Sequence, residues 1–145
     1  HCINWLQNNN FDLEFICCLY ATAPFVKPFD LKYALDLISK QKDDKFIFTA
    51  TNFSFPIQRA IKLNSKGISS MFNPDNFNKR SQDLENAYHD AGQFYIAKPN
   101  IWFEKENLFE GSLPILIPNW RVQDIDEESD WIRAEMMHEI IESII

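Results

Sequence analysis

The sequence predicts an α/β fold with a parallel sheet, and three features lead to this class. The continuous apolar run Phe15–Tyr20 is typical of a strand that is buried on both faces, as strands of parallel sheets are. A helical apolar stripe from Leu31 to Ile38 follows, with Asp30 as its expected N-cap. A second apolar strand is expected at Lys45–Thr51. Strand, helix and strand in this order predict a βαβ unit with a right-handed crossover.

The remaining elements fit a single domain with one insertion. Alternating residues and the turn signal Asn64–Gly67 predict a hairpin made of the segments 57–63 and 68–72, within an insertion at 53–80. Other expected elements are a helix ending near Asn9, a strand at 92–96, a short helix at 99–106 and a strand at 114–117.

An acidic helix is expected to end the chain. Asp126 or Ser129 is the expected N-cap, and the acids of its first turn suit the helix dipole. Its apolar residues recur at helical spacing and are expected to face the core. They are Trp131, Ile132, Met136, Ile140 and Ile144.

Composition narrows the functional classes. The chain has 145 residues, 46% of them hydrophobic, and a net charge of -7, of which the stretch from Asp124 onward carries eight acids and one base. The basic residues gather between Gln58 and Arg80, which suits an anionic small molecule. The overall acidity argues against nucleic acid, and no apolar run is long enough to predict a membrane span. Cys17 and Cys18 are interpreted as reduced core thiols, which predicts a cytoplasmic protein.

One segment, Arg80–Tyr95, is unusually rich in residues that bind ligands. It contains Arg, Gln, Asp, Glu, His and Tyr side chains and ends in a β-type apolar run. Two interpretations are open. The segment is an ordinary polar loop, or it is a ligand wall in which Arg80 faces an anion while Gln82, Asp90 and Gln93 bind hydroxyls or amides.

Three motifs resemble a known family. The sequences Arg80–Glu85 and Tyr88–Tyr95, with Phe55–Ala60 before them and Arg121–Asp126 after them, resemble the pseudaminic acid cytidylyltransferases, bacterial relatives of CMP-sialic acid synthetase. The resemblance extends from about Phe15 to the last helix. It implies a partial Rossmann-like nucleotide-sugar transferase sheet with flanking helices and a protruding β-hairpin that forms a homodimer.

The resemblance also implies a reaction and its residues. CMP would pass from CTP to a nonulosonic sugar acid, with pseudaminic acid favoured, and pyrophosphate would be released. Mg²⁺ would be held by the catalytic carboxylates Asp124 and Asp126, assisted by Arg80. The implied substrate-binding residues are Thr22, Gln58, Arg59, Gln82, Tyr88, Asp90 and Gln93. The residues alone, without the resemblance, favour a different interpretation over metal binding, in which Asp124 is a surface acid and Asp126 a helix cap.

Two departures from the family pattern concern the nucleotide. The family has a Gly-rich, basic loop that grips the triphosphate, whereas the glycines here, Gly67, Gly92 and Gly111, are widely scattered. Ala21 stands where the family usually has proline. We therefore expect an N-terminally truncated enzyme that is inactive or feeble on its own. A noncatalytic sugar-binding or dimerising module is the alternative, and an unrelated α/β metal-dependent phosphatase or nucleotide-binding domain is a third possibility.

Overall fold

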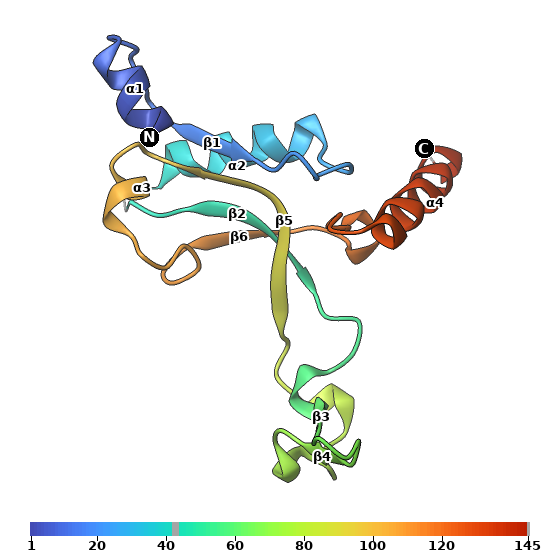
Figure 1. Cartoon of the computed structure of the whole chain (residues 1–145). Coiled ribbons are helices and arrows are strands. Elements are labelled where there is room, and N and C mark those ends of the chain that lie inside the picture. Colours follow the sequence, from blue (N-terminus) through green and yellow to red (C-terminus); the bar gives the residue numbers. More distant parts are fainter. Residues whose placement is uncertain (42–43, 145) are drawn as a thin grey trace.

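The computed structural model describes residues 1–41 and 44–144 and shows a mixed α/β architecture (Figure 1). Its central sheet has the order β1-β5-β2-β6, formed by Ile16–Leu19, Tyr88–Ala97, Ile47–Asn52 and Leu113–Leu116. β5 runs antiparallel to both β1 and β2, whereas β6 is parallel to β2. The α/β class is confirmed. The expected all-parallel sheet is wrong because β5 lies between β1 and β2, the two strands of the predicted βαβ unit.

β1 lies at an edge of the described sheet, and this position corrects the prediction for its cysteines. Cys17 and Cys18 are both free thiols and both are exposed, so they are not core residues. An edge strand has a neighbour on one side only, and here that neighbour is β5. Partial burial, with a smaller contribution from Cys18, raises the pKa of the Cys17 thiol, which makes it a poorer nucleophile at neutral pH.

Alternation along β2 divides the core between the two faces of the sheet. Ile47 packs with Phe94 and Ile96 beneath α2 (Pro28–Lys40), whose Ala34 and Ile38 are buried there. Phe46 and Phe48 belong to the opposite face. There they pack with Tyr95 of β5 and with Ile101 of the short helix α3 (Ile101–Glu104). The helix expected around residue 101 is therefore confirmed, and it closes the second face of the sheet.

A small lobe protrudes from the sheet at the end of a narrow neck (Figure 1). It contains the two-stranded hairpin β3 (Ile61–Leu63) and β4 (Ser69–Met71). The predicted turn is confirmed, since Asn64 accepts the Lys66 and Ile68 N–H groups and Gly67 has a positive φ of 74°. The first expected strand is shorter than predicted, because Ile57–Arg59 form the 3-10 turn η1.

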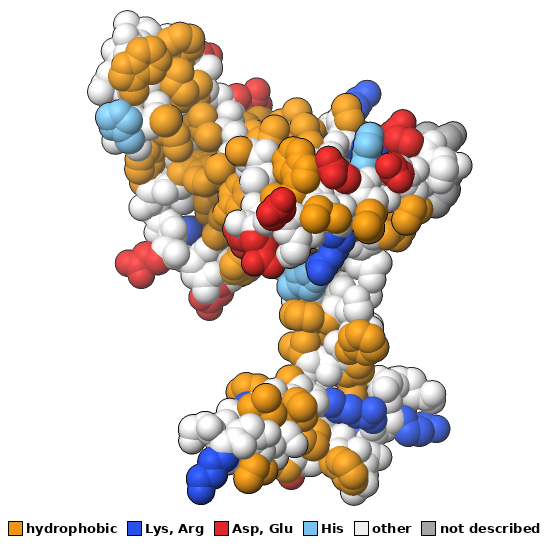
Figure 2. All heavy atoms as spheres, turned by 45° about the vertical axis from the view of Figure 1, so that its right-hand side comes forward, with side chains coloured by type: hydrophobic (Ala, Val, Ile, Leu, Met, Phe, Trp, Pro, Cys, Tyr) orange, Lys and Arg blue, Asp and Glu red, His pale blue; other side chains and the backbone are white. Residues whose placement is uncertain are grey.

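The lobe joins exposed apolar side chains to basic ones (Figure 2). Phe55, Leu63 and Phe77 are 83%, 66% and 73% exposed. A two-stranded hairpin this small buries little apolar surface, so these side chains stay exposed to solvent within one chain. The remaining short turns of the lobe and neck are η2 (Pro74–Asn76) and η3 (Ser81–Asp83).

Two helices flank the sheet at the ends of the chain. α1 spans Cys2–Asn8, as expected, and has no buried residue. α4 spans Glu128–Ile144 and follows the 3-10 turn η4 (Asn119–Arg121). None of the helices in the described residues has the length and apolar character that a bilayer crossing requires.

The predicted buried stripe of α4 is wrong. Trp131, Met136 and Ile140 are 56%, 60% and 58% exposed, and Ile132 is exposed as well. The burial of Ile144 lies outside the described residues. α4 instead buries Ala134 and Ile141 against Phe25 of the loop after β1. Helical periodicity predicted the helix correctly but not its buried face. Apolar residues occur on both the Ala134–Ile141 side and the Met136–Ile140 side, and only the first side packs against the core.

The predicted capping residues are also corrected. Asp30 does not cap α2, because the N-cap is Lys27. Asp30 instead lies buried in the first turn of the helix. Ser129 lies inside α4 and does not cap it. The carboxylate of Asp130 accepts the backbone N–H groups of Asp126 and Glu127, each at 3.3 Å.

Candidate functional site

Three loops that carry predicted site residues leave the sheet at the same edge. β1, β2 and β6 all run in one direction, since β1 and β2 are both antiparallel to β5 and β6 is parallel to β2. Their carboxyl ends therefore lie along one edge, where ligands gather in open α/β sheets. Thr22 follows β1, the neck follows β2, and Asp124 follows β6. β5 contributes its amino end, Tyr88–Asp90, to the same edge.

The chain brings Thr22 to Asp124 across 102 positions of sequence. The Thr22 hydroxyl donates to Asp124 Oδ1 at 3.5 Å, and the Ile125 N–H donates to the same oxygen at 3.1 Å. Ile125 packs with Phe25 and Met137, whereas Asp124 and Asp126 on either side of it are exposed. The apolar anchor at Ile125 therefore leaves both carboxylates facing away from the core.

This pair of carboxylates fits a hard divalent cation that also binds phosphate. Mg²⁺ prefers oxygen ligands and is typically held by one or two carboxylates together with substrate phosphates and water. Among residues 1–41 and 44–144 no group of three or more His, Cys, Asp or Glu side chains could hold a metal on its own. Asp124 and Asp126 would therefore need phosphate oxygens to complete a coordination shell.

Asp90 is held at the amino end of β5. Its Oδ1 accepts the Gly92 N–H at 3.0 Å, and its Oδ2 accepts the Tyr95 hydroxyl in a short hydrogen bond. Gly92 has a positive φ of 60°, within the stretch where the β2–β5 register shifts. Burial, followed by the hydrogen bond to Asp90, raises the pKa of the Tyr95 hydroxyl well above its usual value.

A hollow lies where the neck leaves the sheet. This neck cavity has a volume of about 510 Å³, and Gln58 and Tyr88 line it. A second cavity of about 330 Å³ is lined by Asp90 and His89 and shares Tyr88 with the first. Three predicted substrate-binding residues thus border two adjoining hollows. Asn52 and Asn86 also line the neck cavity and were not singled out, because an amide beside a strand has no distinctive sequence signal.

Gln58 is fixed at the wall of the neck cavity. Its side-chain amide donates to the Glu85 backbone carbonyl at 2.6 Å. Its backbone carbonyl accepts from the side-chain amide of Asn76 at 3.1 Å. These contacts join the segment that leaves β2 to the segment that leads back into β5. The ring of His89 lies 4.8 Å from the ring of Phe53, measured between centroids.

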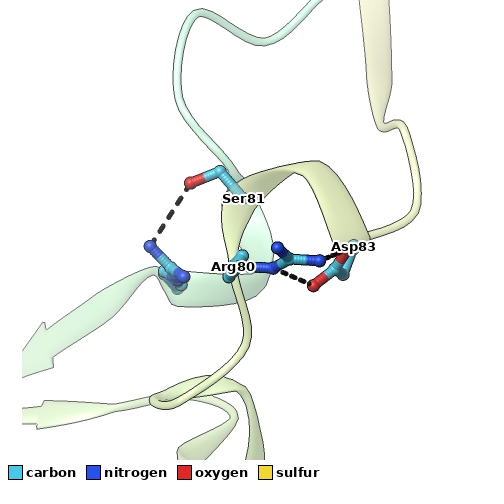
Figure 3. Close-up of polar contacts among 4 residues, drawn as sticks. Arg80, Ser81 and Asp83 are labelled. Atoms are coloured by element: carbon cyan, nitrogen blue, oxygen red, sulfur yellow. Dashed lines mark hydrogen bonds and ion pairs between the residues drawn. The ribbon is translucent and has the colours of Figure 1, made fainter.

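The remaining polar residues of the wall lie in the lobe or beside it. Arg80 forms a forked contact with Asp83, at 2.8 and 3.1 Å, and Arg59 Nη1 donates to the Ser81 hydroxyl at 3.4 Å (Figure 3). Gln82 is exposed in η3. Figure 1 shows the lobe at the far end of the neck from α4. Within one chain, the structure does not bring Arg80 beside the acidic pair.

Gln93 and Arg121 lie inside the molecule. Gln93 is 3% exposed, and its Nε2 donates to the Arg121 carbonyl at 2.7 Å. Arg121 is 5% exposed and forms an ion pair with Asp30. Arg121 therefore pairs inside the fold with Asp30, and not with the exposed carboxylates of Asp124 and Asp126. Nothing in the sequence relates two residues 91 positions apart.

Comparison with known proteins confirms the resemblance. No protein-family model matches the chain. A pseudaminic acid cytidylyltransferase of Campylobacter jejuni is 40% identical over 139 residues, which cover 95% of this chain and 60% of that protein. A Helicobacter pylori protein named pseudaminic acid cytidylyltransferase and UDP-2,4-diacetamido-2,4,6-trideoxy-beta-L-altropyranose hydrolase is 31% identical over 79% of this chain and 22% of its own length.

An N-acylneuraminate cytidylyltransferase of Oncorhynchus mykiss is more distant. It is 30% identical over 87% of this chain and 29% of its own length. The chain spans 60% of the length of the Campylobacter relative, so the shared region includes the three motifs but not the whole of that protein.

Proposed function

We propose that this relative of the pseudaminic acid cytidylyltransferases serves the transfer of CMP from CTP to a sialic-acid-like sugar acid, with pseudaminic acid as the favoured acceptor. The observation that carries the proposal is the shared edge of the sheet, where an exposed acid pair and a polar cavity wall lie at the ends of adjacent strands. The 40% identity to a named cytidylyltransferase supports the reaction class.

The acid pair is assigned to the cation. Asp124 and Asp126 would hold Mg²⁺, and Thr22 would orient Asp124 through its hydroxyl. A bound Mg²⁺ would neutralise charge on the phosphate oxygens during transfer. The reacting hydroxyl of the sugar would attack the α-phosphorus of CTP, and pyrophosphate would leave. Such a reaction depends on positioning and charge more than on covalent catalysis.

The polar wall is assigned to the sugar. Asp90 is pre-oriented by Gly92 and Tyr95, and its remaining lone pairs would accept hydrogen bonds from sugar hydroxyls. Tyr88 and Gln58 border the same hollows. Gln93 supports this wall from behind, through its bond to Arg121.

The lobe is assigned to a homodimer. Its exposed apolar residues need a partner surface, and a second copy would cover them. Arg59, Arg80 and Gln82 would then act on the site of the second copy, since Arg80 does not lie beside Asp124 within one chain. Arg80 is free to exchange its exposed partner Asp83 for a substrate carboxylate or phosphate.

Turnover tests the proposal. Pyrophosphate release should require CTP, pseudaminic acid and Mg²⁺ together, and the double variant Asp124→Ala/Asp126→Ala should lose at least a thousandfold of the rate. Sugar binding without pyrophosphate release would favour the noncatalytic module instead. Phosphate release from CTP without any sugar would favour a phosphatase.

A further inference from the structure

A buried ion pair joins Asp30 to Arg121, which lies three residues before Asp124 in the chain. Arg121 and Asp30 are 5% and 4% exposed, and Arg121 Nη2 contacts the Asp30 carboxylate. The same nitrogen donates to the Phe25 carbonyl at 3.1 Å, and the guanidinium lies over the Phe29 ring at 5.1 Å. Buried charges persist only where they are paired and hydrogen-bonded, so these contacts hold their partners in one arrangement.

Arg121 joins four segments that are far apart in the sequence. Its side chain contacts the loop after β1 through Phe25 and the first turn of α2 through Asp30. Its carbonyl accepts from Gln93 in β5, and Arg121 itself ends η4. Removal of this one side chain would therefore break the contacts of the segment that leads to α4 with Phe25 and with Asp30.

The two segments that Arg121 joins are the ones that carry the proposed cation ligands. Thr22 lies three residues before Phe25, and Asp124 lies three residues after Arg121. The Thr22–Asp124 hydrogen bond spans the same junction, and at 3.5 Å it is too long to fix the junction on its own. Phe25 and Ile125 add apolar contact in one cluster with α4.

We propose that Arg121 is a positioning residue for the acid pair. It holds the loop after β1 against residues 122–126, and the orientation of Asp124 depends on that junction. The part of this inference that concerns the cation rests on the proposed function. The part that concerns the junction does not.

Two measurements on the full chain test the inference. Amide hydrogen exchange should accelerate at least tenfold in residues 21–26 and 122–126 of Arg121→Met, while Phe48 and Tyr95 in the centre of the sheet keep their protection. Mn²⁺ affinity, measured by water-proton relaxation, should fall at least tenfold. Lys98→Met is the matched control, because Lys98 forms an exposed ion pair with Asp44 at 2.7 Å and should behave as wild type.

Arg121→Lys is the conservative variant, and it tests the positioning role of Arg121 if Arg121→Met does not fold. An ammonium can pair with Asp30 but lacks the planar guanidinium that lies over the Phe29 ring, so we expect a smaller acceleration confined to the same residues. Exchange that rises uniformly over all elements, or that stays unchanged in the folded variant, overturns the positioning role. If wild type binds no Mn²⁺, the proposed cation site fails, and the exchange measurement still decides the junction.

Discussion

At the scale of single residues, we expect buried polar contacts to contribute more to the stability of this chain than exposed ion pairs do. Asp30 and Arg121 are buried together, and Tyr95 donates to Asp90 at the margin of the core. Arg80 and Lys98 have exposed partners, and such pairs contribute little to stability in water. The buried contacts therefore should dominate the response to substitution.

Asp30→Asn leaves the Arg121 guanidinium buried without its counter-charge. Breaking a buried pair on one side costs about 3–5 kcal/mol, which we expect as the loss in free energy of unfolding measured with urea. The matched control Asp44→Asn breaks the exposed pair with Lys98 and should change nothing measurable. Equal effects of the two substitutions would show that the Asp30 contact is not a specific buried ion pair.

Tyr95→Phe removes the hydroxyl that donates to Asp90. The loss of one buried hydrogen bond predicts a cost of about 1–2 kcal/mol at pH 7. The pKa of Tyr95 is raised in the folded protein, so the folded state holds this proton more tightly than the unfolded state does. Its stabilising contribution is complete below pH of about 10, the value of an unperturbed tyrosine, and is lost as pH rises above it.

Urea unfolding between pH 9 and 11 measures that dependence. Wild type should lose stability more steeply than Tyr95→Phe over this interval, and Tyr33→Phe, at an exposed position of α2, should follow wild type. Parallel curves for wild type and Tyr95→Phe would contradict the assignment.

At the scale of elements, sequence patterns predicted which segments form helices and strands, but not which neighbours they have. The strand at 92–96, the helix near 101 and the Asn64–Gly67 turn follow from local signals such as β-branched runs and a glycine with positive φ. Cys17 and Trp131 were assigned to the core because apolar periodicity does not reveal whether a strand lies at an edge or which helix face is covered.

The lobe gives a prediction at this scale. Leu63 in β3 is 66% exposed, so Leu63→Glu should fold normally and should reduce self-association at least tenfold in sedimentation. Ser65→Glu, in the hairpin turn, adds the same charge outside the apolar surface and is the control. A wild-type chain that is monomeric throughout, or a Leu63→Glu variant that associates as wild type does, would remove the lobe as a dimer surface.

At the scale of the whole molecule, the shared direction of β1, β2 and β6 organises the candidate site. Thr22, Tyr88 and Asp124 were predicted from motifs, and the structure places their segments along one edge. Arg80 was predicted to assist the acid pair, and in this chain it precedes η3 and pairs with Asp83 instead. Motifs identify residue types and their order, whereas the separation of a lobe from its sheet depends on long-range packing that the motifs do not encode.

Paramagnetic broadening by Mn²⁺ tests the central claim, that Asp124 and Asp126 form the cation site at this edge. In amide NMR spectra, sub-stoichiometric Mn²⁺ should broaden residues 21–25 and 124–127 first, and Asp124→Ala/Asp126→Ala should abolish this effect. The exposed acids of α4, such as Glu139 and Glu142, serve as an internal control for nonspecific attraction. Broadening spread evenly along α4 and unchanged in the double variant would contradict the account.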